Sequence, residues 1–422
     1  MKSIAICLMA LGATAALGAP LSMEDAQRRA VDRSRQLAAA ESGIAASREM
    51  AIAAGQLPDP VLRAGIDNLP VEGGDKYSLT RDFMTMRRIG LMQELTRSGK
   101  RDLRRQRFER EADKGLAEKD AALATIQKDT ALAWLDRFYL EAMQRAVADF
   151  IGASDTEVQS ADAAYRAGRG PQSDVFATRA ALALARDRES EIGRRLRAAR
   201  IDLARWTGEP RDEPLAQPPE MERVPLASDS LEVHLAAHPE VLALDRQSEV
   251  ADLDARLADA AKDPDWTVEA TFQQRGPAYS NMVSIGISIP LPWDKANRQD
   301  REAAAKRATA EEARARRDEM LRAHLAEVAG MLDEWRTGRE RQSRFRAEIL
   351  PLSAERTHAA LAGYAGGKGS LADVLSARRN ESDMALQSLQ LDLDVARLWA
   401  RLRFLLPDAG LATTTHHRSQ AQ

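Results

Sequence analysis

The sequence contains the same order of segments twice. A glycine-containing stretch, AYRAGRGPQSDV at 164–175, returns as GYAGGKGSLADV at 363–374, with a tyrosine, two glycines and an Asp-Val pair in register. A tract almost free of proline and glycine precedes each stretch, at 100–166 and at 295–363. As a helix, each tract would form a rod of roughly 100 Å, too long for an ordinary globular domain. The duplication therefore predicts an extended helical architecture.

Two segments with a period of two residues stand before each long tract. In WTVEATF (266–272) and VSIGISIPL (283–291), apolar side chains alternate with small or polar ones. LPDPVLRAGI (57–66) and RRIGLMQEL (87–95) occupy the same places in the first half. The alternation predicts one β-hairpin per half, with an apolar face and a polar face. Shorter helices are predicted before each hairpin and after each glycine stretch, at about 22–55, 172–206, 229–262 and 371–404.

The predicted organisation has five regions. An apolar run from Ile4 to Leu17 that ends in small residues is typical of a secretory leader at 1–18. The other regions are a first repeat at 19–208, a proline-rich connector at 209–228, a second repeat at 229–406 and a polar tail at 407–422. Cys7 lies in the leader and is the only cysteine, so the mature chain is predicted to have no disulfide, thiolate metal site or cysteine nucleophile.

Composition and motifs argue against nucleic-acid binding and against catalysis. The formal net charge is -3, so the chain has no basic excess that would attract nucleic acid. The spacing from Gly363 to Gly367 is one residue short of a phosphate-binding loop, and Gly369 follows Lys368 where such a loop has Ser or Thr. No Ser-His-Asp set, carboxylate pair or dinucleotide loop is recognisable. We therefore predict that the protein is not an enzyme and uses no cofactor.

The two glycine stretches are interpreted instead as tight reversals between helices, and we call residues 164–175 and 363–374 the tip corners. Their paired glycines, which would allow positive φ, are Gly168, Gly170, Gly367 and Gly369. Ser370 and Asp373 have the spacing of a capping box. In the other corner, Pro171 suits the first turn of a helix and Asp174 is the expected capping residue.

Four strands cannot close a membrane barrel alone, since the smallest barrels have about eight strands. Three copies would supply twelve. The predicted fold class is therefore mainly α with a small β-barrel portion; the trimer, whose 12-stranded barrel is continued by a long helical tunnel, is what the family resemblance described below implies. The polar residues predicted to line the barrel lumen are Arg63, Asp67, Glu269 and Thr271. The aromatic residues Trp266, Tyr279 and Trp293 would lie near the strand ends, at the membrane interfaces.

The doubled order of segments, the repeated corner and the leader resemble the TolC family of outer-membrane efflux proteins. LPDPVLRAGIDNLP (57–70) and FMTMRRIGLMQELTRSGKR (83–101) are similar to the CzcC-like branch, which is associated with heavy-metal export. Two departures are the lack of a lipidated cysteine after the leader and a Thr-Arg-Ser sequence at 96–98, where that branch usually has a proline.

The resemblance implies a passive outer-membrane channel with a periplasmic helical domain. It implies a homotrimer that works with a periplasmic adaptor and an inner-membrane pump of the resistance-nodulation-division type. It also implies that the tip corners lie at the periplasmic end and contact the adaptor. The contact candidates are Arg166, Gly168, Arg169, Gly170, Asp174, Gly367, Lys368, Gly369 and Asp373.

Other interpretations remain open at the level of sequence. A periplasmic coiled-coil structural or adaptor protein would need the β segments to form a soluble domain. A channel could also serve organic toxicants or type I secretion, because the sequence does not identify the cargo. His234 and His238 stand four apart on a predicted helix and could belong to a periplasmic metal-binding module, but two ligands alone do not predict a metal site. The charged run at 301–319 is interpreted as a solvated helix face with i,i+4 pairs.

Overall fold

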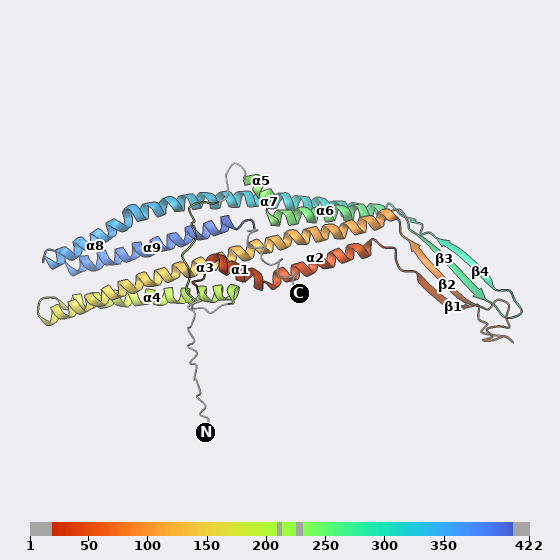
Figure 1. The fold of residues 1–422 in the computed structure, drawn as a ribbon, viewed down its shortest axis with the longest axis horizontal. Coiled ribbons are helices and arrows are strands. Elements are labelled where there is room, and N and C mark those ends of the chain that lie inside the picture. The colour runs from red at the N-terminus through yellow and green to blue at the C-terminus, as the bar shows by residue number, and fades with distance from the viewer. Residues whose placement is uncertain (1–18, 209–212, 225–230, 408–422) are drawn as a thin grey trace, which may run out of the picture. The chain divides into compact units, whose positions relative to one another are not determined.

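The computed structural model describes residues 19–208, 213–224 and 231–407 (Figure 1). The predicted leader, nearly all of the polar tail and two parts of the connector lie outside the described residues. The chain divides into two compact units. The sheet-bearing unit comprises Arg35–Leu123 and Ala227–Glu327, and the tip-bearing unit comprises Met1–Ser34, Ala124–Leu226 and Val328–Gln422. Each unit thus combines segments from both sequence repeats.

The described chain is mainly helical, with one small sheet, as the sequence predicts. The helices are α1 (Met23–Arg33), α2 (Arg35–Ala54), α3 (Ser98–Arg166), α4 (Gln172–Thr207), α5 (Leu231–Ala236), α6 (Pro239–Ala260), α7 (Gln299–Arg344), the π-helical turn η2 (Phe345–Ile349), α8 (Leu350–Ala365) and α9 (Leu371–Arg403). The strands are β1 (Val61–Asp67), β2 (Met86–Leu95), β3 (Trp266–Gln274) and β4 (Met282–Ser288).

The four strands form one antiparallel sheet in the order β1-β2-β3-β4 (Figure 1). Each predicted hairpin pairs within itself, and the two hairpins join because β2 pairs with β3. Proline-containing segments precede β1 and β3, where a helix cannot continue. The sheet therefore brings the two sequence repeats together, with β1 and β4 as its edge strands.

Two helices predicted as continuous, over 22–55 and 229–262, are each broken. Ser34 has an extended ψ of 110° and separates α1 from α2. His238 has an extended ψ of 133° and separates α5 from α6, because the following Pro239 disfavours a helical conformation in the residue before it. A serine side chain can hydrogen-bond to nearby backbone groups in non-helical conformations, which lowers the free-energy cost of a helix break at Ser34.

The second long tract is one run of helix that contains a π turn. Pro351 has no N–H group, and its ring would collide with the carbonyl group of Ala347, four residues earlier, in a regular α-helix. At η2 the N–H of Leu350 donates to the Phe345 carbonyl, five residues back, which widens the turn before the proline. The long tract of the first repeat contains no proline and forms the unbroken helix α3.

Helices α6 and α7 of the sheet-bearing unit are antiparallel and connected by ion pairs. The pairs run in opposite sequence directions: Arg307 with Asp259 at 2.6 Å, Arg314 with Asp252 at 2.6 Å and Arg317 with Asp245 at 2.9 Å. The charged run at 301–319 is thus only partly the solvated face that was predicted, since these three arginines bind the neighbouring helix. The i,i+4 spacing of charges within the run gives no indication that these arginines also pair with another helix.

The core of the tip-bearing unit lies between helices of both repeats. Leu140, Met143 and Val147 of α3 pack with Ile192, Leu196 and Ala199 of α4 and with Leu393 of α9. Ion pairs add to this contact, including Arg378 with Glu157 at 2.7 Å and Arg397 with Asp136 at 2.6 Å. No helix within the described ranges is long and apolar enough to cross a membrane.

Candidate functional site

One face of the sheet carries all four residues predicted to line a lumen. Arg63 lies opposite Gly90 in the strand register, and Gly90 lies opposite Thr271. Arg63 Nη1 is 3.5 Å from Glu269 Oε2, and the Thr271 hydroxyl donates to Glu269 Oε1 at 3.3 Å. Asp67 occupies the same face, at the end of β1. The period-two pattern therefore identified a polar surface formed by strands from both repeats.

Arg88 belongs to this polar face and was missed by the sequence analysis. Its Nη1 lies 3.5 Å from Asp67 Oδ2 on the neighbouring strand. The alternation in β2 contains the signal, because Arg88 and Gly90 fall on the same side of the strand, opposite Ile89 and Leu91. Asp67 and Glu269 on this face are thus each accompanied by an arginine, whereas Glu94, on the same face of β2, accepts a hydrogen bond from the Thr96 hydroxyl.

The opposite face of the sheet is apolar and exposed in the single chain. Ile285 is 78% exposed, although an isoleucine is normally buried. Other exposed apolar side chains of this face are Leu62, Ile66, Ile89, Leu91, Phe272, Val283 and Ile287. Such a continuous apolar patch is uncommon on a soluble monomer and is typical of a surface that lipid or another protein covers.

Exposed aromatic side chains lie toward the ends of the strands. Trp266 begins β3, and Trp293 follows β4 with 91% of its surface exposed. Tyr279 lies in the turn between β3 and β4, where the Arg275 guanidinium stacks over its ring. These positions agree with the predicted placement of the aromatic residues in the sheet. Their role at a membrane interface stays a prediction.

Both tip corners end their first helix with the same hydrogen-bond pattern. Gly168 has φ +69°, its N–H donates to the Tyr165 carbonyl at 2.9 Å, and the next N–H donates to the Ala164 carbonyl at 2.9 Å. Gly367 has φ +70° and shows the equivalent pair of bonds. This is the Schellman motif, in which a left-handed residue, usually glycine, terminates a helix. The repeat in sequence is therefore a repeat in backbone geometry.

The second glycine of each corner serves a different purpose from the one predicted. Gly170 and Gly369 are not in the left-handed region. A Cβ at Gly369 would lie 3.1 Å from both Gly363 C and Tyr364 N, and one at Gly170 would lie 3.4 Å from Ala164 Cβ. Glycine is favoured at Gly369 because the chain passes close to the end of the preceding helix, whereas the contact at Gly170 is an ordinary van der Waals distance.

The two corners begin their second helix differently. The predicted capping box is confirmed at Ser370, whose hydroxyl accepts from the Asp373 N–H while its own N–H donates to the Asp373 carboxylate, both at 3.2 Å. In the other corner, Pro171 is the N-cap rather than the first helical residue, and it makes no side-chain cap bond. Asp174 does not cap as predicted, because Pro171 has no N–H for it to accept from.

The tip corners lie side by side in the tip-bearing unit. Ala161 and Val175 of the first corner's helices pack with Leu371 and Val374 of the second. The predicted contact cations Arg169 and Lys368 are exposed, and the Arg166 side chain is 79% exposed while pairing with Asp162 at 2.5 Å. One chain therefore presents two glycine turns and three exposed cations on one joint surface.

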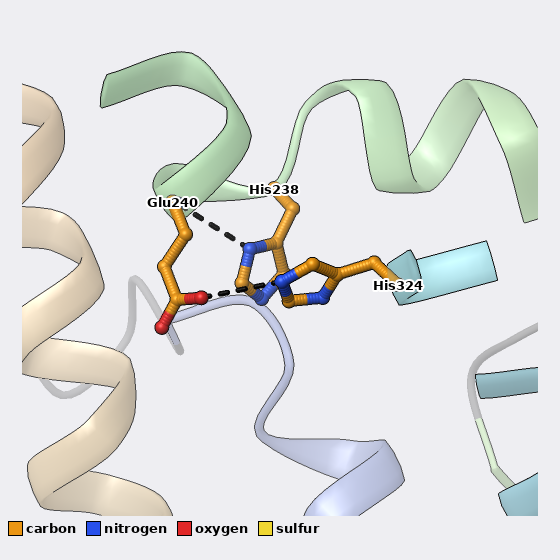
Figure 2. A group of neighbouring side chains, drawn as sticks. All are labelled: His238, Glu240 and His324. Atoms are coloured by element: carbon orange, nitrogen blue, oxygen red, sulfur yellow. Dashed lines mark hydrogen bonds and ion pairs between the residues drawn. The ribbon is translucent and has the colours of Figure 1, made fainter. Parts of the chain in front are cut away.

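The histidine pair suggested by the sequence is not brought together on one helix. His234 lies in the last turn of α5, whereas His238 is the N-cap of α6. His238 instead packs against His324 of α7, with ring centroids 4.7 Å apart and ring planes tilted by 41°, and Glu240 adjoins both (Figure 2). His324 was missed because it lies 86 positions away, in a region of plain helical pattern.

Comparisons with known proteins point to one family. Residues 231–407 match the family model described as "Outer membrane efflux protein". The matched segment is less than half of the chain. It contains the second sequence repeat, including β3, β4 and the second tip corner. A comparison with curated protein sequences found no match to the chain.

Solved structures show a likeness in fold that extends beyond the matched segment. The outer-membrane channel OprN has 16% identity and a TM-score of 0.78, covering 92% of this chain and 90% of that one. CmeC of Campylobacter jejuni, an outer membrane channel, has 13% identity and a TM-score of 0.78, with coverage of 94% and 89%. VceC of Vibrio cholerae has 20% identity and a TM-score of 0.74, with coverage of 91% and 95%. The chain thus has the fold of outer-membrane channels with a helical tunnel.

Proposed function

We propose that the protein is the outer-membrane channel of a tripartite efflux system and that it conducts its cargo passively. The observation that carries this proposal is the sheet, which has a charged face built around Arg63 and Glu269 and an exposed apolar face built around Leu62 and Ile285. Lipid would cover the apolar face, and water would fill the space beside the charged one. The family match of residues 231–407 supports the same function.

The sheet requires partners if it lies in a membrane. Its edge strands β1 and β4 would leave backbone N–H and C=O groups without partners, and each such group costs several kcal/mol in hydrocarbon. Pairing β4 of one chain with β1 of the next removes both edges. Three copies would then close a barrel of twelve strands, with the helices continuing as a tunnel into the periplasm.

The tip corners are the proposed contact with a periplasmic adaptor, and through it with a pump of the resistance-nodulation-division type. The glycine turns keep the backbone close to the surface at Gly168 and Gly367, and Arg169 and Lys368 add exposed positive charge. An adaptor segment with acidic side chains would complement this surface. The Schellman turns at Gly168 and Gly367 support a rigid surface rather than a flexible loop.

Heavy-metal cations are the proposed cargo, on the support of the two CzcC-like stretches at 57–70 and 83–101. The test is growth of a deletion strain on zinc, cobalt, cadmium, copper and silver, beside organic toxicants and an assay for type I secretion. We expect loss of tolerance to one or more metals, restored by the gene on a plasmid. Unchanged metal tolerance with new sensitivity to organic toxicants would contradict the proposal that heavy metals are the cargo. It would not contradict the proposal that the protein is an efflux channel.

The assembly is tested separately by fractionation and mass measurement. We expect the protein in the outer-membrane fraction, soluble only in detergent, with a native mass three times that of the mature chain. A monomer that stays dispersed in buffer without detergent would contradict the channel and favour a periplasmic structural or adaptor protein.

Charge reversal tests the proposed docking surface. Lys368→Glu combined with Arg169→Glu should lower export while the trimer remains in the outer membrane, because only the tip corners are altered. Arg401→Glu is the matched control, since Arg401 is also exposed but lies at the other end of α9. Equal export by both variants would contradict docking at the tip corners.

A further inference from the structure

Two helices of the sheet-bearing unit converge on a group of two imidazoles and one carboxylate. His238 and Glu240 lie at the start of α6, and His324 projects from α7 (Figure 2). Each residue offers one possible ligand atom, and these atoms all lie within 4.8 Å of one another. Two nitrogen donors and one oxygen donor are the ligand types found in zinc sites with three protein ligands.

The spacing of these atoms is close to that of a coordination sphere. His324 Nε2 lies 3.2 Å from Glu240 Oε2. Two ligand atoms bound to zinc at about 2.0–2.1 Å and at a tetrahedral angle are about 3.3 Å apart. The two atoms are thus already at the separation that a shared cation would impose, and only the His238 ring has to approach.

Burial also favours a bound ion. His238 is 7% exposed and the His324 side chain 12%, whereas the Glu240 side chain is 48% exposed. The carboxylate offers a route to solvent, so an ion could enter and keep a water ligand.

One hydrogen bond opposes binding and limits the expected affinity. His238 Nδ1 accepts from the Glu240 backbone N–H at 3.3 Å, so a neutral ring has its proton on Nε2. A cation must therefore replace this N–H at Nδ1 or displace the Nε2 proton. The hydrogen bond is long, and its loss costs less than the coordination bond contributes.

We propose that His238, Glu240 and His324 bind one divalent cation of the zinc class, with water in the remaining position. Imidazole ligands select Zn²⁺, Co²⁺, Ni²⁺ or Cu²⁺ over Mg²⁺ and Ca²⁺, which prefer all-oxygen sites. The ion would join the beginning of α6 to α7, a connection that conduction itself does not require. The proposal therefore does not depend on the cargo of the channel.

The test is equilibrium dialysis of the full-length protein against Zn²⁺, with bound metal measured by mass spectrometry and Mg²⁺ as the negative probe. We expect one Zn²⁺ per chain at this site and a rise in melting temperature. Removing one of three ligands by His324→Gln or Glu240→Gln should weaken binding by about tenfold or more and abolish the rise.

A control variant, a common background and a further ligand variant complete the design. His358→Gln removes an exposed histidine of α8 and should bind Zn²⁺ as the wild type does. All variants are measured in a background with His416→Gln and His417→Gln, because two adjacent imidazoles in the tail could bind metal independently. His238→Asn preserves a side chain that can cap α6, and it should fold but lose the tight site.

The proposal is overturned if the wild type does not bind Zn²⁺ more tightly than Mg²⁺. It is also overturned if Glu240→Gln, His324→Gln and His238→Asn all retain wild-type affinity. Should His324→Gln misfold, as circular dichroism would show, the half-exposed Glu240 provides the decisive variant. If either of these two results is obtained, the contact between His324 and Glu240 is a polar interaction between α6 and α7 that binds no metal.

Discussion

Arg63 on β1 forms an ion pair with Glu269 on β3, although β2 lies between the two strands. The pair is possible because Gly90, opposite Arg63 on β2, has no side chain on the charged face. At 3.5 Å and with both side chains partly exposed, the pair itself contributes at most about 1 kcal/mol to stability. Its importance is to place charge on the surface that we propose lines the lumen.

Gly90→Val should therefore impair the sheet. A Cβ at this position would lie 2.6 Å from Thr271 Oγ1 and 3.1 Å from the Ala270 carbonyl oxygen. We expect a loss of about 1–3 kcal/mol from overpacking and less heat-resistant trimer in the outer membrane. Gly286→Val is the control, because a Cβ at Gly286 meets nothing within 4 Å. Equal amounts of trimer for the two variants would show that the contact at Gly90 is unimportant.

The period-two pattern was sufficient to predict all four strands and the face to which Arg63, Asp67, Glu269 and Thr271 belong. Alternation is a local property of a strand, and it decides the face once the strand exists. The order of the strands was not predictable in this way. Pairing of β2 with β3 joins residues far apart in the sequence, and neither strand contains a signal for its partner.

Glycine at Gly168 and Gly367 is expected to be required for backbone reasons alone. Both have positive φ, and a Cβ at either position meets nothing within 4 Å. Replacing either with Ala should cost about 1–2 kcal/mol, measured by denaturant unfolding of the detergent-solubilised protein. Gly152→Ala, inside α3, should change stability in the opposite direction by about 0.5–1 kcal/mol. A stabilising effect of Ala at Gly168 would contradict the turn geometry.

The helix breaks and the role of the second glycine in each tip corner could not be predicted from the sequence. Ser34 interrupts a helix with no proline or glycine nearby, so no local signal marks the break strongly. Gly170 and Gly369 look identical to Gly168 and Gly367 in the sequence, yet neither has positive φ, and at Gly369 the close approach of the backbone disfavours a Cβ. Such contacts depend on the folded corner and cannot be read from residue types.

His324 was beyond prediction for a similar reason. The sequence analysis paired His234 with His238 by their spacing of four, which holds only on a continuous helix. Pro239 breaks that helix, and α7 then brings His324 to His238. The signal for the break was present in the His-Pro pair, whereas the partner was set by the packing of α6 against α7.

Asp373 should make the second tip corner sensitive to acid. Hydrogen bonds from the Ser370 hydroxyl and then from its backbone N–H lower the pKa of Asp373 from its ordinary value of 3.8. Because the folded pKa is the lower one, this contribution is present above about pH 4 and is lost as pH falls through the folded pKa. Asp373→Ala should therefore destabilise the protein at neutral pH and reduce the difference between neutral and acidic pH.

Asp174→Ala is the matched control for that experiment, since Asp174 occupies the equivalent helix position without the reciprocal bonds. It should change stability and its pH dependence less than Asp373→Ala does. Unfolding curves at neutral and acidic pH measure both variants. A larger effect at Asp174 would mean that the two corners do not differ as their caps indicate.

Tyr139 should remain protonated well into alkaline solution. Burial raises the pKa of Tyr139 to about 12, the nearby Asp392 carboxylate adds to the shift, and Arg346 opposes it. A raised folded pKa stabilises the protein fully below pH 10 and loses this contribution as pH rises from about 10 to about 12. Ultraviolet titration should show a late-ionising tyrosine that is missing in Tyr139→Phe. A titration unchanged by this substitution would contradict the buried position.

The most direct test of the central claim compares neighbouring positions of the sheet in outer-membrane vesicles. Cys7, in the predicted leader, is the only cysteine, so an introduced thiol would be the single one in the mature chain. Ser284→Cys and Ile285→Cys place the thiol on opposite faces of β4, as Arg63→Cys and Leu62→Cys do on β1. A charged, membrane-impermeant maleimide should label the thiols at 284 and 63 through the water-filled lumen and spare those at 285 and 62. Equal labelling of all four, or labelling of the apolar positions alone, would contradict a sheet with one face toward water and the other toward lipid.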